Sequence, residues 1–171
     1  MSAKTAVPVP RDVKLAAFDV DGVFTDGRFY LSDAGVESKA FSTQDGFGIK
    51  KLIAANVQVA IISSRRSGAV DARMRELGVR HVVQGAADKL DAFNLLIESL
   101  QLAAEHCVYV GDDVPDLPVL KRVGFAIAVA NAVGEVKECC DYTTRSPGGF
   151  GAVREVCELL LAARATDRAN G

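Results

Sequence analysis

The segment Lys14-Leu-Ala-Ala-Phe-Asp-Val-Asp-Gly22 decides the fold, because an apolar run ends in two carboxylates and a glycine. A near-continuous apolar run is typical of a strand buried on both faces of a parallel sheet. Open α/β sheets bind ligands at the carboxyl ends of their strands, where Asp19 and Asp21 stand. Residues two apart on an extended chain point the same way, and Gly22 permits a sharp turn. We therefore expect both acids to face one small site.

Short apolar and β-branched runs recur along the chain, separated by longer stretches that suit helices. The expected strands are Lys14–Phe18, Val57–Ile62, His81–Val83, Cys107–Val110 and Phe125–Val129. The expected helices lie at about residues 46–55, 67–78, 88–101, 115–122 and 149–165. Because helical crossovers are the usual way to join parallel strands, the alternation predicts an α/β fold with a doubly wound parallel sheet.

One segment interrupts this alternation. Residues 27–41 read as two strands around the turn Ser32-Asp-Ala-Gly35, which predicts a β-hairpin inserted after the first strand.

The chain has 171 residues, 49% of them hydrophobic, which is enough to bury one sizeable core. We therefore expect a single domain over residues 1–171, with disordered ends at about 1–10 and 166–171.

The composition argues against several functional classes. A formal net charge of -2 gives no reason to expect nucleic acid or a membrane as partner. The first residues, up to Arg11, contain no long apolar core, so we expect no secretion signal and a cytoplasmic protein. The four cysteines form no C-x-x-C pair, which favours free thiols. His81 and His106 each precede an apolar run, which indicates the start of a strand rather than a metal ligand.

A second acidic cluster, Gly111-Asp-Asp-Val-Pro-Asp116, follows the apolar run at residues 108–110. Read alone, Gly-Asp-Asp suits the cap of a helix equally well, and Pro115 suits the first helical turn. Two acidic clusters at neighbouring strand ends offer hard oxygen ligands, which suit Mg²⁺. We therefore expect a magnesium site between them.

Two further residues complete an expected phosphate site. Ser63 ends the apolar run at residues 59–62 and offers a hydroxyl, while Lys89 stands near the start of a helix. A lysine so placed neutralises charge on a phosphoryl group, and a hydroxyl orients it. A single lysine is more often part of a solvated helix face, so the prediction depends on the order of all four elements.

That order, D-x-D-G-V, a strand-end serine, a lysine and then G-D-D-x-x-D, resembles the haloacid dehalogenase superfamily. The resemblance implies that Asp19 attacks phosphorus to form an aspartyl-phosphate, while Asp21 protonates the leaving alcohol and later activates water. It also implies that Mg²⁺ is held by the side chains of Asp19 and Asp112 and the main-chain carbonyl of Asp21. Asp113 and Asp116 are then supporting acids.

Many members of that superfamily carry a cap domain over the site, inserted after the first or the second motif. Between Asp21 and Ser63 this chain has room only for the hairpin and one helix, and between Ser63 and Lys89 only for a helix and a short strand. A site without a cap lies open to water unless another chain covers it. We therefore expect a homo-oligomer with the hairpin at the subunit contact.

A closer resemblance covers residues 13–161. The hairpin, Phe41–Lys50, Ile61–Arg66 and the glycine-rich Pro147–Glu155 are similar to the 3-deoxy-D-manno-octulosonate 8-phosphate phosphatases. It implies a homotetramer that uses Mg²⁺ to release phosphate from an eight-carbon sugar acid in lipopolysaccharide precursor synthesis. By the same resemblance the glycine-rich segment reaches toward a neighbouring subunit's site. The implied substrate-binding residues are Asp21, Ser42, Thr43, Gln44, Asp45, Gly46, Lys50, Arg65, Arg73 and Lys89.

Substrate choice is where the sequence leaves alternatives open. Gln44 and Ser64 stand where many relatives have arginine and glycine, and Gln44 removes one possible anion contact. A sugar acid phosphate carries two anionic groups, for which arginine is well suited, and Arg65 directly follows the second motif. Arg66 and Arg75 fit a solvated helix face better.

The first alternative is a phosphatase for a nine-carbon, sialic-type sugar acid, whose relatives tend to have an acidic residue near the position of Arg65. A phospho-receiver domain is a second alternative. In receivers the phosphate-accepting Asp is on a middle strand and the hydroxyl and lysine follow it, whereas here the hydroxyl and lysine lie between two acidic clusters. A scaffold-only domain of the superfamily is a third alternative. Against it stands the retention of Asp19, Asp21, Lys89 and Asp112.

Overall fold

The computed structural model describes Val9 to Arg168 and has a six-stranded sheet at its centre. The strand order is β5-β4-β1-β6-β7-β8, and every neighbouring pair is parallel. The strands are β1 Leu15–Phe18, β4 Gln58–Ser63, β5 His81–Gln84, β6 Cys107–Gly111, β7 Phe125–Ala128 and β8 Tyr142–Thr143. The predicted α/β class with a doubly wound parallel sheet is confirmed.

The register of the central strands determines where the acidic clusters meet. β1 lies between β4 and β6, with Phe18 opposite Ile61 on one side and Val110 on the other. All four residues of β1 are buried, as its unbroken apolar run predicts. Because the three strands run parallel, the residues that follow them leave the sheet at the same edge.

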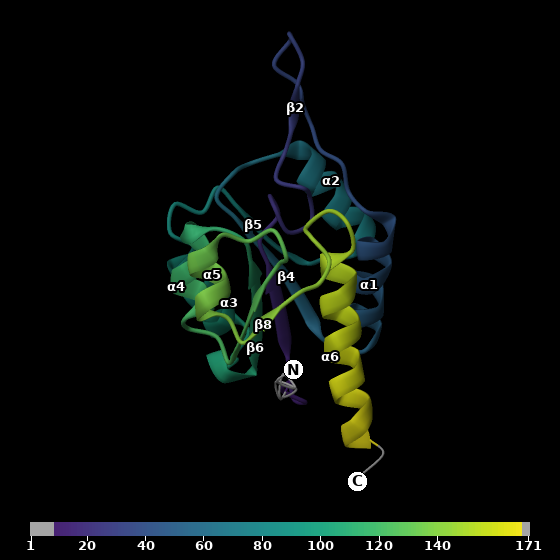
Figure 1. Ribbon diagram of the computed structural model, residues 1–171, viewed down its shortest axis with the longest axis vertical. Coiled ribbons are helices and arrows are strands. Elements are labelled where there is room, and N and C mark those ends of the chain that lie inside the picture. The colour runs from purple at the N-terminus through teal and green to yellow at the C-terminus, as the bar shows by residue number, and fades with distance from the viewer. Residues whose placement is uncertain (1–8, 169–171) are drawn as a thin grey trace, which may run out of the picture.

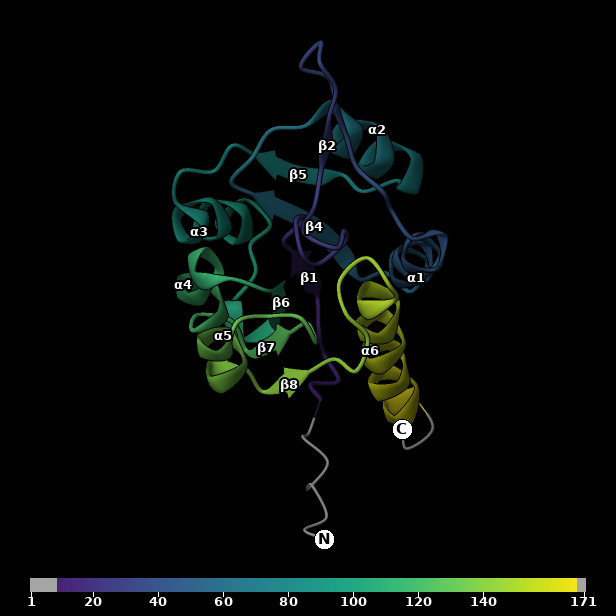
Figure 2. The same ribbon diagram turned by 45° about the horizontal axis from the view of Figure 1, so that its top comes forward.

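Helices cover both faces of this sheet. On one face lie α1 Thr43–Ala54, α2 Gly68–Leu77 and α6 Ala152–Arg168, and on the other lie α3 Lys89–Ser99, α4 Leu117–Leu120 and α5 Gly134–Cys139 (Figures 1 and 2). Two 3-10 turns, η1 Ala104–His106 and η2 Val114–Asp116, precede β6 and α4. Along α6, Val153, Val156 and Leu160 are fully buried, a helical repeat of apolar residues that packs against α1.

The hairpin projects beyond the carboxyl edge of the sheet (Figure 1). It consists of β2 Tyr30–Leu31 paired antiparallel with β3 Glu37–Ser38. Gly35 has a φ of 75° at its turn, a conformation that glycine adopts without strain. Only this hairpin and α1 lie between β1 and β4, and only α2 and β5 lie between β4 and α3, so the described residues contain no cap domain.

Several boundaries differ from those predicted. The element expected at residues 115–122 is η2 followed by the single turn α4, while α5, η1 and β8 were not predicted. These elements are too short to show a hydrophobic period. α6 runs three residues past its predicted end, through part of the segment expected to be disordered; residues 1–8 and 169–171 lie outside the described chain.

The described part of the chain contains no helix with the length and hydropathy needed to cross a membrane.

His81 is the first residue of β5, and His106 ends η1 immediately before β6, as the sequence predicts. Cys107, Cys139, Cys140 and Cys157 are all free thiols.

Gly124 provides a test of the packing at the start of β7. A Cβ added there would lie 2.0 Å from the backbone oxygen of Glu105, so Gly124→Ala must displace backbone. We expect it to lower the free energy of unfolding by about 2–3 kcal/mol in urea titrations. Gly134→Ala is the matched control, because beyond its chain neighbours and its own helix no described atom lies within 4 Å of the added carbon. Equal stability of the two variants would contradict this packing.

Candidate active site

A pocket of about 280 Å³ lies at the carboxyl ends of β1, β4 and β6. It brings together residues from all four motifs that the sequence singled out. Its lining consists of Asp19, Asp21, Gly27, Ser63, Ser64, Arg65, Lys89, Asp112, Asp113, Pro115 and Asp116.

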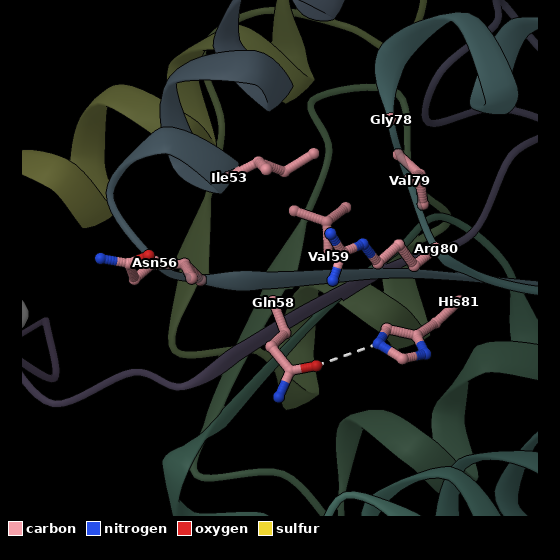
Figure 3. Close-up of a pocket in the computed structure, with 9 residues that line it drawn as sticks. Ile53, Asn56, Gln58, Val59, Gly78, Val79, Arg80 and His81 are labelled. Atoms are coloured by element: carbon pink, nitrogen blue, oxygen red, sulfur yellow. Dashed lines mark hydrogen bonds between the residues drawn. The ribbon is translucent and has the colours of Figure 1, made fainter.

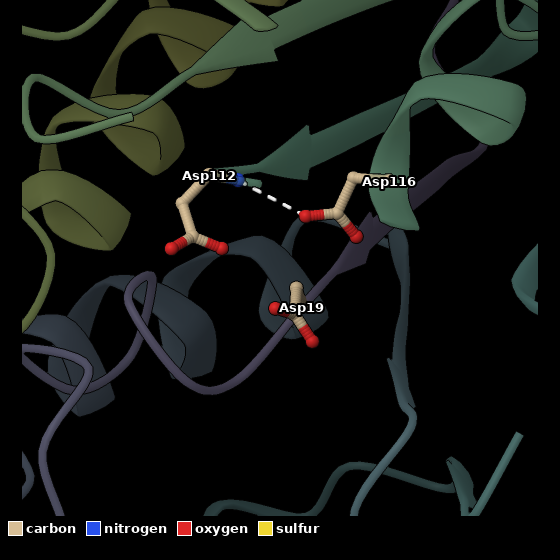
Figure 4. A group of neighbouring side chains, drawn as sticks. All are labelled: Asp19, Asp112 and Asp116. Atoms are coloured by element: carbon tan, nitrogen blue, oxygen red, sulfur yellow. Dashed lines mark hydrogen bonds between the residues drawn. The ribbon is translucent and has the colours of Figure 1, made fainter. Parts of the chain in front are cut away.

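Three carboxylates meet at the base of this pocket. Asp19 follows β1, Asp112 follows β6 and Asp116 lies in η2, and one oxygen from each lies within 4.8 Å of the others (Figure 4). The loop after β1 approaches closely: Gly22 has a φ of 89°, and a Cβ added there would lie 2.0 Å from Asp112 Oδ2. A glycine is therefore required at this position for the two acidic segments to pack together.

The Lys89 ammonium lies between two of these acids. Its Nζ is 2.8 Å from Asp19 Oδ1 and 2.7 Å from Asp116 Oδ1, and the residue is only 6% exposed. Lys89 is the first residue of α3, which Asp88 caps by accepting hydrogen bonds from two backbone amides of the first turn. Burial acts to lower the pKa of Lys89, but the charges of Asp19 and Asp116 outweigh it and raise the pKa. The lysine is therefore held as a cation.

Asp116 is fully engaged by the protein. It accepts hydrogen bonds from Lys89, from the Tyr109 hydroxyl at 2.8 Å, and from the backbone amides of Asp112 and Asp113. The sequence interpretation overlooked Tyr109, although a tyrosine on a buried strand needs a partner for its hydroxyl. Asp116 thus orients Lys89, whereas Asp113 is exposed and accepts from the Val114 amide at the start of η2.

The charges of this cluster do not balance without a cation. Burial and the charge of Asp116 raise the pKa of Asp19 to about 6, against the partial opposition of Lys89. Burial and the neighbouring acids raise the pKa of Asp112 to about 8. Three ionised carboxylates beside one ammonium leave two negative charges uncompensated. A divalent cation with a preference for oxygen ligands, such as Mg²⁺, fits this donor set.

Asp21 and Ser63 lie nearer the mouth of the pocket. The Asp21 carboxylate accepts a hydrogen bond from Lys39 and lies 3.7 Å from Arg65 Nε. Ser63 is 3% exposed, and its hydroxyl oxygen lies 3.4 Å from the Arg65 backbone amide. Lys39, which the sequence interpretation did not consider, reaches the site from the hairpin.

The predicted substrate-binding residues of α1 and α2 do not line this pocket. Asp45 is instead buried, and its Oδ1 accepts a hydrogen bond from the Arg154 amide at 2.8 Å in the first turn of α6. Ser42 is the N-cap of α1, and Arg73 donates to the Ser42 carbonyl and pairs with Glu76. The first turn of α1 packs against α6, which keeps these residues away from the carboxylates. Of the others, Gly46 is buried, while Thr43, Gln44 and Lys50 are exposed.

The glycine-rich segment at residues 147–151 packs on its own chain. Gly149 donates to the Val23 carbonyl, and a Cβ on Gly148 would lie 1.8 Å from the Gly22 carbonyl oxygen. Asn131 joins both segments, donating to Gly22 and accepting from Gly148. These glycines were expected to reach a neighbouring subunit. In this chain they support the loop that carries Asp21.

A second hollow, of about 420 Å³, lies at the opposite edge of the sheet, near the start of β4 and β5 (Figure 3). Its polar side chains include Gln58 and His81, which form a hydrogen bond with 2.9 Å between Gln58 Oε1 and His81 Nε2. It contains no carboxylate and no part of the four motifs. The carboxylate pocket is therefore the candidate active site.

The raised pKa values of Asp19 and Asp112 predict how stability depends on pH. Both acids bind a proton more tightly in the folded protein than in the unfolded chain, where their pKa is the ordinary 3.8. The free energy of unfolding of the metal-free protein should therefore fall as pH rises from about 4 to about 8. Asp112→Asn should equal wild type near pH 4 and exceed it by about 1–2 kcal/mol at pH 8.5 in urea titrations with a chelator. Added Mg²⁺ should stabilise wild type more than the variant. A less stable variant at pH 8.5 would contradict this account.

Comparison with known proteins places this chain in a family. A model for the haloacid dehalogenase-like hydrolase family matches residues 75–155. The 3-deoxy-D-manno-octulosonate 8-phosphate phosphatase of Escherichia coli K12 is 45% identical over 161 residues, which cover 94% of this chain and 86% of that protein.

Solved structures show the same relationship. A probable YrbI family phosphatase from Pseudomonas syringae has 51% identity and a TM-score of 0.90, with 94% and 91% of the two chains covered. The 3-deoxy-D-manno-octulosonate 8-phosphate phosphatase of Moraxella catarrhalis, in complex with magnesium, phosphate and KDO, has 44% identity and a TM-score of 0.89, with 93% and 91% covered. This chain therefore belongs to the 3-deoxy-D-manno-octulosonate 8-phosphate phosphatases of the haloacid dehalogenase superfamily.

Proposed function

We propose that this protein is a Mg²⁺-dependent phosphatase that hydrolyses 3-deoxy-D-manno-octulosonate 8-phosphate to the free sugar acid and phosphate. The observation that carries the proposal is the buried Lys89 ammonium held between Asp19 and Asp116, with Asp112 beside them. Such a cluster offers a nucleophile, a cation for phosphoryl oxygens and ligands for a divalent metal in one pocket. The names of the relatives, together with the magnesium, phosphate and KDO in one of them, support the substrate.

In the first step Asp19 attacks phosphorus. Its carboxylate oxygen forms a bond to phosphorus while the bond from phosphorus to the sugar oxygen breaks, giving an aspartyl-phosphate and the free sugar acid. Asp21, in its protonated form, transfers its proton to the departing sugar oxygen. Lys89 and the hydroxyl of Ser63 contact the phosphoryl oxygens and stabilise the charge that develops there.

In the second step water hydrolyses the intermediate. Asp21, now a carboxylate, takes one proton from the attacking water, whose oxygen bonds to phosphorus. The bond between phosphorus and Asp19 breaks, so phosphate leaves and the Asp19 carboxylate is regenerated. The hydrogen bond from Lys89 to Asp116 orients the ammonium beside Asp19, the residue that carries the phosphoryl group in the intermediate.

The side chains of Asp19 and Asp112, with the main-chain carbonyl of Asp21, are suited to hold Mg²⁺. When bound, the ion neutralises charge on the phosphoryl oxygens and lowers repulsion between Asp19 and the incoming anion. Asp112 must give up its proton for this role, which the cation itself favours.

Arg65 is the residue best placed to select the substrate. Arg65 lines the pocket that contains Asp19, and we propose that its guanidinium contacts a second anionic group of the bound phosphate ester. An eight-carbon sugar acid presents a carboxylate for such a contact, which a planar guanidinium binds with two donors. A phosphatase of a nine-carbon sugar acid remains the alternative that the same pocket permits.

Phosphate release tests the function directly. Wild-type protein with Mg²⁺ should hydrolyse the eight-carbon ester with a higher kcat/KM than a nine-carbon sugar acid phosphate, and chelation should abolish activity. Asp19→Asn removes the nucleophilic charge, so kcat should fall by at least about 1,000-fold. Asp91→Asn, an exposed acid on α3, is the matched control and should retain wild-type activity. Activity in Asp19→Asn equal to wild type would falsify the covalent mechanism.

We further propose a cytoplasmic homotetramer in which the hairpin lies at the subunit contact. The hairpin exposes four large apolar side chains: Phe29, Tyr30, Leu31 and Val36. A cluster of this kind on a projecting element is typical of a protein–protein contact. It also stands beside the pocket mouth, where a second chain would reduce access of water to the intermediate.

Light scattering after size-exclusion chromatography tests this arrangement. Wild type at micromolar concentration should have the mass of four chains. The double variant Leu31→Asp with Val36→Asp places charges in the expected contact and should shift the mass to one or two chains. Leu95→Asp, equally exposed but on α3, should leave the mass unchanged. A monomeric wild type would count against the proposal.

A further inference from the structure

Four charged side chains of alternating sign form a closed ring at the mouth of the pocket: Asp21, Lys39, Glu37 and Arg65. Lys39 Nζ donates a hydrogen bond to Asp21 and lies 3.6 Å from Glu37 Oε1. Arg65 Nη2 lies 2.5 Å from Glu37 Oε2, and Arg65 Nε lies 3.7 Å from Asp21 Oδ2. The ring therefore joins the loop after β1, the hairpin and the loop after β4.

Lys39 is the most buried member of the ring. Its side chain is 1% exposed, compared with 22% for Asp21, 19% for Glu37 and 47% for Arg65. A lysine this deeply buried is rare unless it is paired, because its ammonium loses its hydration. Glu37 lies in β3 and Lys39 directly follows that strand, and the two side chains are paired, so Glu37 holds Lys39 while Lys39 contacts Asp21.

Arg65 is already held by other groups. Its guanidinium binds Glu37 and lies 4.2 Å from the centre of the Phe29 ring, a cation–π contact from the other strand of the hairpin. Its distance of 3.7 Å to Asp21 is longer than a hydrogen bond. Among the described residues, the side-chain hydrogen bond to the Asp21 carboxylate therefore comes from Lys39.

Glu37 is held as an anion within the ring. Partial burial acts to raise the pKa of Glu37, but hydrogen bonds from Ser67 and Arg65 and the charges of Lys39 and Arg65 bring that pKa below its ordinary value. Glu37 thus supplies a permanent negative charge that keeps both cations in place.

We propose that Lys39 is a positioning residue: through its hydrogen bond to Asp21, the hairpin fixes the carboxylate that exchanges a proton with the leaving oxygen. This inference rests on the proposed function, in which Asp21 is the proton donor of the first step. A general acid acts only within hydrogen-bond reach of the atom it protonates, and a displacement of about 1 Å can cost 100-fold in rate. Glu37 supports the arrangement by holding Lys39 and Arg65.

A purely structural role for the ring makes a different prediction. If it only attaches the hairpin to the domain, its loss lowers the rates for all phosphate esters in the same proportion. If Lys39 positions the proton donor, the loss is large for esters whose leaving group needs a proton. The loss is then small for esters whose leaving group departs as an anion.

The leaving-group dependence of kcat/KM separates the two roles, because this constant reports only the steps up to release of the alcohol. It should be measured for wild type and Lys39→Met with a series of aryl phosphates and with the sugar acid phosphate. We expect Lys39→Met to lose about 10- to 100-fold with the sugar ester and less than about 3-fold with 4-nitrophenyl phosphate. Lys51→Met, which breaks an exposed pair with Glu158, is the matched control.

A double-mutant cycle supplies the second measurement. In an Asp21→Asn background, Lys39→Met should change kcat/KM for phenyl phosphate by less than about 2-fold, because the group that it positions is absent. A crystal structure of Lys39→Met should show the Asp21 side chain displaced. If Lys39→Met does not fold, Lys39→Gln takes its place under the same criteria.

The outcomes are distinct. Equal losses on every ester, or full additivity with Asp21→Asn, would overturn the role of Lys39 while leaving the phosphatase intact. A wild-type protein without Mg²⁺-dependent phosphatase activity would overturn the proposed function, and the inference with it.

Discussion

The contact on which the site depends is the ammonium of Lys89 between Asp19 and Asp116. Neither acid is more than 6% exposed, and without the lysine both charges would be buried against each other. The same contact aligns three elements, since Asp19 follows β1, Asp116 lies before α4 and Lys89 begins α3. The cluster thus buries several charges, and it also arranges them as a phosphoryl group requires.

The parallel register of the sheet makes this contact possible. β1 is flanked by β4 and β6, so the residues after these three strands emerge at one edge. Close packing then depends on a few small residues. At Gly22 and Gly148 any side chain would overlap the neighbouring loop. The central strands supply rigidity, while the glycines allow the loops between them to approach within contact distance.

Much of this could be read from the sequence, because the decisive pattern is local. An apolar run followed by acids predicts a buried strand with a polar end, and Asp19, Ser63 and Asp112 all follow from that rule. Asn131 was missed because its partner Gly22 is distant in the sequence. Tyr109 was missed although Asp116 is only seven residues away, because it stands in an ordinary apolar strand and the turn that brings Asp116 back to it is not visible in the pattern. Lys39 was missed for a related reason: in an exposed hairpin, alternation does not show which face meets the pocket. The contact of Asp45 with the first turn of α6 could not be foreseen, because the sequence alone does not show that α1 packs on α6.

The loop that carries Asp21 is held by residues that come much later in the sequence. Asn131 donates to the Gly22 carbonyl across 109 positions of sequence, and Gly149 donates to the Val23 carbonyl. A ribosome makes the chain from the amino end, so the first motif leaves the exit tunnel long before its supports exist. The loop that carries Asp21 therefore acquires its full set of contacts only after Asn131 and Gly149 have also been made.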